Sequence, residues 1–128
     1  MIIDSAHKLA RHCNSQMHRQ NSLLPIAFQS SDDKISVALL DYHDGDFENQ
    51  LNSVIGCIKQ TREFKKSHRV AVISVNLVKE VCREVSIIHD GEKYDCHTII
   101  KAHLEESERE RLASDSTLYD LSLNVVIP

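Results

Sequence analysis

The dipeptide Asp90-Gly91 stands between two extended stretches, and it limits the folds open to this chain more than any other feature. Such a pair is typical of a two-residue β-hairpin loop, because a type I′ turn needs a positive φ at both positions. With this loop fixed, residues 80–102 are predicted to form a hairpin in which Glu84 faces His97. One face of the hairpin is then mostly apolar, and the other pairs opposite charges across the strands.

Hydrophobic periodicity divides the remainder of the chain between helices and strands. Apolar residues at helical spacing predict helices, while alternating or β-branched apolar runs predict strands. Helices are expected at 3–19, 47–66 and 104–112. Further strands are expected at 23–29, 35–42, 70–77 and 118–128.

These elements follow one another in the order α-β-β-α-β-β-β-α-β. Because helices and strands do not alternate regularly and a hairpin is present, the order predicts an α+β fold. The 128 residues correspond to one domain, so we expect a single α+β domain over 1–128. Its sheet is expected to be antiparallel or mixed, with five to six strands and helices mainly on one face.

Composition excludes several classes of function. The three glycines are far apart, which argues against a glycine-rich phosphate-binding loop. The net charge of −4 argues against a nucleic-acid-binding protein, because phosphate neutralisation needs a basic field. The sequence contains neither a long apolar run nor a signal-peptide pattern, so we expect a cytoplasmic protein without membrane contact.

The motif His-Asp-Gly occurs twice, at 43–45 and 89–91, and each copy precedes an acidic residue. Carboxylates and imidazoles are ligands for divalent metals, so these segments suggest a metal-dependent hydrolase or nuclease. The candidate ligands are Asp41, His43, Asp44 and Asp46, with Asp95 and His97 as further members. The structural interpretation is favoured, because turns and the cap of the second helix use most of these acids.

The four cysteines are scattered and form no C-x-x-C pair, so we expect free thiols. Cys82 and His97 are predicted to lie on one face of the hairpin, as a nucleophile and its base would. Cys82 faces Ile99 there, and an apolar setting raises the pKa of a thiol and makes it inert. We therefore expect no covalent catalysis.

The leading prediction is a small soluble interaction or ligand-binding module that is oligomeric and has no catalytic activity and no cofactor. A sheet covered on one side exposes an apolar patch, which favours a homodimer with Cys82, Ile88 and Ile99 near the contact. The first alternative is the hydrolase or nuclease with a divalent metal at 41–46. The second is a nucleic-acid accessory protein that uses the basic stretch 59–69. The sequence does not identify a protein or small-molecule partner.

Overall fold

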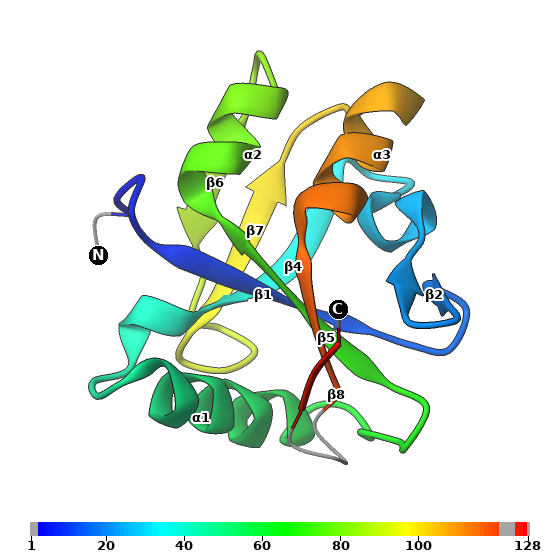
Figure 1. Ribbon diagram of the computed structural model, residues 1–128. Coiled ribbons are helices and arrows are strands. Elements are labelled where there is room, and N and C mark those ends of the chain that lie inside the picture. Colours follow the sequence, from blue (N-terminus) through cyan, green and yellow to red (C-terminus); the bar gives the residue numbers. More distant parts are fainter. Residues whose placement is uncertain (1–2, 121–124, 128) are drawn as a thin grey trace.

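The computed structural model describes residues 3–120 and the backbone of residues 125–127 (Figure 1). Its main feature is a seven-stranded sheet of order β6-β7-β4-β1-β5-β8-β9 in which every neighbouring pair is antiparallel. The strands are β1 (Lys8–Cys13), β4 (Lys34–Leu39), β5 (Arg69–Ser74), β6 (Ser86–His89), β7 (His97–Lys101), β8 (Thr117–Asp120) and β9 (Val125–Ile127). The helices are α1 (Phe47–Lys59), α2 (Val75–Val81) and α3 (Glu106–Asp115), with short 3-10 helices η1 (Pro25–Phe28) and η2 (Leu40–Tyr42). A separate two-stranded ribbon pairs β2 (His18–Arg19) with β3 (Ser22–Leu23).

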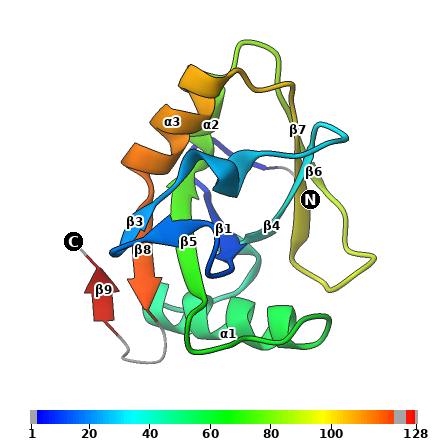
Figure 2. The same cartoon turned by 90° about the vertical axis from the view of Figure 1, so that its right-hand side faces the viewer.

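The sheet separates two hydrophobic cores. Successive strand residues point to opposite faces, so Leu9 belongs to the core beneath α2, α3 and η1, whereas Ala10 belongs to the core beneath α1. Figures 1 and 2 show α1 at the opposite end of the molecule from α2 and α3. The predicted α+β class is therefore confirmed, with two helices on one face and α1 on the other.

Helix α1 follows from local sequence. The side chain of Asp46 accepts a hydrogen bond from the backbone N–H of Asn49 at 2.9 Å, which caps the first turn. Of the apolar stripe predicted for this helix, four residues are buried against the sheet and the fifth, Phe47, is only partly buried; the four are Leu51, Val54, Ile55 and Ile58. The helix ends at Lys59 rather than at residue 66.

The prediction of a helix at 3–19 is wrong, because this segment contains strand β1. The strand lies in the interior of the sheet, between β4 and β5, and both of its faces are covered. Leu9, Ala10 and Arg11 are consecutive and all buried, so the strand lacks the alternation that marks a half-exposed strand. Its apolar residues therefore matched helical spacing by coincidence.

The predicted register of the hairpin at 80–102 is also wrong. Ile87 pairs with Ile100 and His89 with Thr98, and residues 90–96 form the loop between β6 and β7. Gly91 does not adopt a positive φ, so the two-residue turn is not formed. Local hydrogen bonds close the loop instead: the N–H of Asp90 donates to the carbonyl of His97 at 2.9 Å, and the N–H of His97 donates to the carbonyl of Tyr94 at 3.0 Å.

Three further segments differ from expectation. The strand predicted at 70–77 ends at Ser74, whose side chain accepts from the N–H of Leu77 at 3.1 Å and caps α2. The segment 23–29 is mostly the 3-10 helix η1, whose start at Pro25 suits a residue without an N–H. The prediction of one continuous strand at 118–128 is wrong, because β8 and β9 pair antiparallel with each other; residues 121–124 lie outside the described residues.

Candidate metal centre

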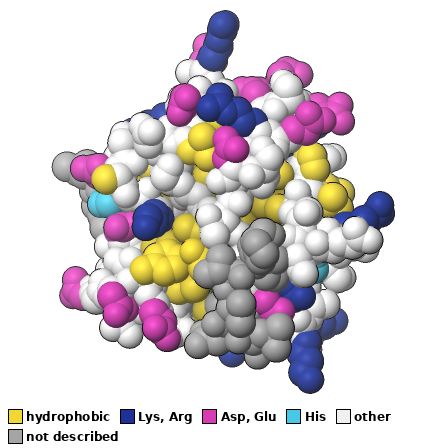
Figure 3. All heavy atoms as spheres, viewed as in Figure 1, with side chains coloured by type: hydrophobic (Ala, Val, Ile, Leu, Met, Phe, Trp, Pro, Cys, Tyr) yellow, Lys and Arg dark blue, Asp and Glu magenta, His cyan; other side chains and the backbone are white. Residues whose placement is uncertain are grey.

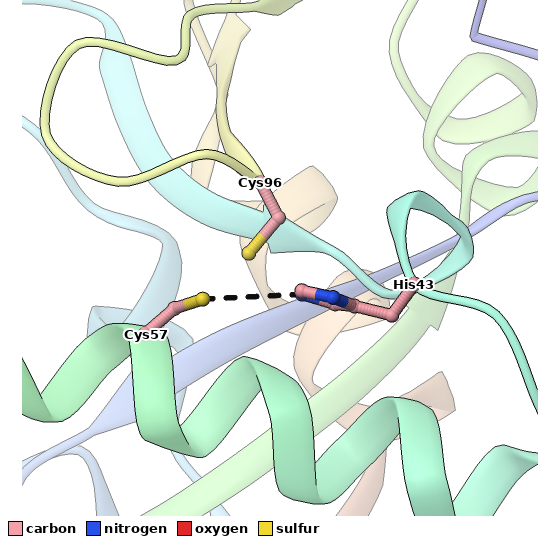
Figure 4. Close-up of side chains that lie close together, drawn as sticks. All are labelled: His43, Cys57 and Cys96. Atoms are coloured by element: carbon pink, nitrogen blue, oxygen red, sulfur yellow. Dashed lines mark hydrogen bonds between the residues drawn. The ribbon is translucent and has the colours of Figure 1, made fainter.

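Three side chains from three separate elements converge above α1 (Figure 4). His43 follows η2, Cys57 lies in the last turns of α1, and Cys96 precedes β7. One imidazole nitrogen and the two sulfur atoms all lie within 4.8 Å of one another. Across residues 3–120, no other three His, Cys, Asp or Glu side chains come together in this way.

Backbone hydrogen bonds hold His43 and Cys96 in place. The N–H of His43 donates to the carbonyl of Leu40 at 3.1 Å, and its own carbonyl accepts from Gln50 Nε2 at 3.0 Å. The carbonyl of Cys96 accepts from the N–H of Leu39 at 2.8 Å. These bonds tie both residues to α1 and to the end of β4, so the site is built on regular elements.

The Cys96 thiol is a poor nucleophile in the metal-free protein. Burial, followed by the neighbouring Cys57, raises the pKa of the Cys96 thiol to about 12. His43 Nε2 is 3.9 Å from Cys57 Sγ, a weak contact.

Two thiols and one imidazole form a donor set suited to soft or borderline metal ions. Zn²⁺ is held in proteins by sulfur and nitrogen ligands in tetrahedral arrangement. Three protein ligands leave one of the four positions for water or another molecule. Hard ions such as Mg²⁺ prefer oxygen ligands and would not be retained by these donors.

The six ligands predicted from the sequence do not assemble, and among them only His43 belongs to the cluster. Asp41 Oδ1 accepts from the N–H of Lys8 at 2.7 Å, and Asp46 caps α1. Asp44 and Asp95 are exposed. Figure 3 shows acidic side chains in the lower left, over the start of α1, spread outward into solvent.

His97 is buried, and both of its ring nitrogens are engaged. Nδ1 lies 3.0 Å from the backbone carbonyl of Asp90, and Nε2 lies 2.7 Å from Ser36 Oγ. Burial lowers the pKa of His97. The predicted partner, Glu84, is exposed and lies outside the strands, so the pairing of Glu84 with His97 is wrong.

Sequence reasoning missed Cys57 and Cys96 as ligands because it treated them as buried apolar side chains. Nothing local connects residues 43, 57 and 96, which lie far apart in the chain. One signal was available: Cys57 lies three residues after Val54, beside the buried stripe of α1. A thiol at the border of that stripe can face both the sheet and a neighbouring loop.

Comparison of the chain with protein-family models, curated proteins and solved structures found no match. Its function must therefore be argued from its own residues. Of the helices in the described part of the chain, none is long and apolar enough to cross a lipid bilayer.

Proposed function

We propose that this protein is a small metal-binding module that holds one soft or borderline transition-metal ion, such as Zn²⁺, through His43, Cys57 and Cys96. The observation that carries the proposal is the convergence of these three ligand atoms within 4.8 Å. This role is one form of the ligand-binding module expected from the sequence. It requires no catalysis.

The surroundings of the buried Cys96 sulfur favour metal binding over simple packing. The cysteine is fully buried, yet its sulfur lies beside a second thiol and an imidazole rather than among hydrocarbon side chains only. A bound cation would convert the thiols to thiolates and satisfy all three donors together. The partly buried His43 and Cys57 leave a path for the ion from the surface.

Titration of the reduced, metal-free protein with Co²⁺ and Zn²⁺ tests the proposal. Co²⁺ bound by cysteine should give a thiolate-to-metal charge-transfer band, and calorimetry with Zn²⁺ should give one ion per chain. Zn²⁺ should also raise the melting temperature, since a ligand that binds only the folded state stabilises it by about 2.7 kcal/mol at 100 times Kd. A chelator should reverse this shift.

Variants of the site separate metal binding from general packing. Cys57→Ser and His43→Gln should each lose the charge-transfer band or weaken Zn²⁺ binding at least about tenfold. Cys82→Ala removes a buried thiol in the other core and should bind Zn²⁺ like the wild type. Absence of metal binding by the reduced wild-type protein would refute the proposed function.

The predicted self-association is a second proposal, favoured by one exposed apolar pair. Ile88 is 47% exposed on β6, which is an edge strand, and its cross-strand partner is the partly buried Ile99. We propose that two copies meet through this edge as a twofold homodimer. Cys82 is only 2% exposed and packs in the core beneath α2 and α3, so it would not form part of the contact.

We also propose a cytoplasmic location, and the basic stretch 59–69 would carry the alternative role of a nucleic-acid accessory protein. In the basic stretch 59–69, Arg69 Nη2 lies 3.3 Å from Asp120 Oδ2, so this cation has an internal acidic partner. Lys59, Arg62, Lys65 and Lys66 are exposed. This small patch on an acidic protein favours the metal-binding role over nucleic-acid binding.

A further inference from the structure

Ser36 and His97 lie on neighbouring strands, β4 and β7, and their side chains meet. Ser36 Oγ is 2.7 Å from His97 Nε2, the distance expected for a strong hydrogen bond. On the far side of the ring, Nδ1 lies 3.0 Å from the backbone carbonyl of Asp90 and 3.8 Å from its carboxylate. The hydroxyl and the imidazole are thus arranged as in a serine hydrolase, but the acceptor beyond the ring is the backbone carbonyl of Asp90 rather than its carboxylate.

The partners of the imidazole determine where its proton lies. A carbonyl oxygen can only accept a hydrogen bond, so Nδ1 must carry the proton and donate it to Asp90. In the neutral ring, Nε2 is then an acceptor, and the Ser36 hydroxyl donates to it. This is the tautomer that a general base needs to take a proton from serine.

Ser36 is also more accessible than its partner. The side chain of Ser36 is partly exposed, whereas the exposed fraction of His97 is 2%. The backbone partner of Ser36 on β7 is Ile99, which gives the hydroxyl an apolar neighbour.

From this geometry we propose that Ser36 is a nucleophile, with His97 as its base and Asp90 as a positioning residue, and that it acts on carboxylic esters with short apolar acyl groups. This activity goes beyond the metal-binding role and does not depend on it. The apolar neighbour of Ser36, Ile99, favours a short apolar acyl chain.

The proposed reaction has two steps. Ser36 Oγ bonds to the acyl carbon while its proton passes to His97 Nε2. The bond between that carbon and the alcohol oxygen then breaks, and the alcohol leaves with the proton from His97. In the second step His97 takes a proton from water, the resulting hydroxide attacks the acyl-serine, and the released Ser36 oxygen regains a proton as the carboxylic acid departs.

Labelling with a fluorophosphonate tests the proposal directly, because such a probe phosphonylates an activated serine and releases fluoride. The metal-free protein is treated with the probe, and intact mass and peptide mass spectrometry locate the adduct. We expect one adduct per chain, on Ser36, and hydrolysis of a short-chain p-nitrophenyl ester by the same preparation. Ser36→Ala should lose both.

His97→Gln retains a hydrogen-bonding side chain but removes the base, so labelling should slow by roughly 100-fold while circular dichroism shows an unchanged fold. Ser86→Ala alters an exposed serine on the edge strand and should label like the wild type. No adduct, an adduct at another residue, or labelling of folded His97→Gln at the wild-type rate would overturn the proposal. Ser36 would then serve as a packing partner of His97.

Discussion

Tyr42 stacks on His89, with ring centroids 5.6 Å apart and an interplanar angle of 27°. Tyr42 also meets the neighbouring His43 ring edge-on at 5.3 Å. His89 Nε2 in turn donates to the carbonyl of Asp95 at 2.7 Å, one residue before Cys96. The two His-Asp-Gly segments therefore flank one cluster: the first supplies a ligand, and the second braces the loop that carries another.

Removal of the Tyr42 ring should loosen this arrangement. Tyr42→Ala is expected to lower the free energy of unfolding by about 1 kcal/mol, the usual worth of an aromatic pair. It should also weaken Zn²⁺ binding, because both His43 and the Cys96 loop lose a support. Tyr42→Phe keeps the ring and should match the wild type in urea denaturation and metal titration. Equal behaviour of the alanine variant would show that the stacking does not position the ligands.

The two turn glycines should respond differently to the same substitution. Gly45 has a φ of 102°, and an added Cβ would lie 3.1 Å from Asn49 Cβ, so Gly45→Ala should cost roughly 1–3 kcal/mol of stability. Gly91 has no positive φ, and the nearest atom to an added Cβ would be the carbonyl oxygen of Asp95, at 3.4 Å. Gly91→Ala should cost less. Urea midpoints in the reverse order would contradict the assigned turn geometry.

Stability should fall on mild acidification because of His12. Burial, followed by the charge of His68, lowers the pKa of His12 to about 4 in the folded protein, from 6.5 in the unfolded chain. Between these values the unfolded chain binds the proton and the folded one does not, so stability present above pH 6.5 is lost toward pH 4.

His12→Gln should therefore flatten the pH dependence of the urea midpoint between these two pH values. The flattening is expected to be partial, because burial also lowers the pKa of His68 and of His97. His12 Nε2 and His68 Nδ1 are 2.9 Å apart, so the substitution also changes this hydrogen bond. The urea midpoints of the variant and the wild type must therefore be compared at each pH. An undiminished slope in the variant would show that His12 is not the group that titrates.

The proposed homodimer should depend on the β6 edge. Light scattering at micromolar concentration is expected to give the mass of two chains for the wild type and of one chain for Ile99→Lys. A lysine cannot be buried at a self-facing apolar contact without a partner charge. Ile26→Lys changes an isoleucine on η1 that is 47% exposed, as Ile88 is, and should leave the dimer intact. A monomeric wild type would rule out this mode of association.

The sequence by itself determined the elements whose signals are local. The buried stripe of α1 and the Asp46 cap depend only on residues within a few turns of each other, and both are present as predicted. Strands β4 and β5 are rich in apolar and β-branched residues, and this local pattern predicts both of them. The irregular order of helices and strands was sufficient to predict the α+β class, because it excludes repeated βαβ units.

Tertiary structure alone decided which strands pair and which side chains meet. The interior strand β1 is covered on both sides, so its residues carry no periodicity that separates strand from helix. In the β6–β7 register, Ile87 pairs with Ile100, and hydrogen bonds of His89 and His97 stabilise the longer loop between the strands. This register differs from the one that a two-residue turn at Asp90-Gly91 predicts. The three ligand side chains, His43, Cys57 and Cys96, meet only because α1 packs beneath the sheet and the loop 90–96 ends close to that helix. No local pattern records such a meeting, since its energy comes from contacts between residues distant in the chain.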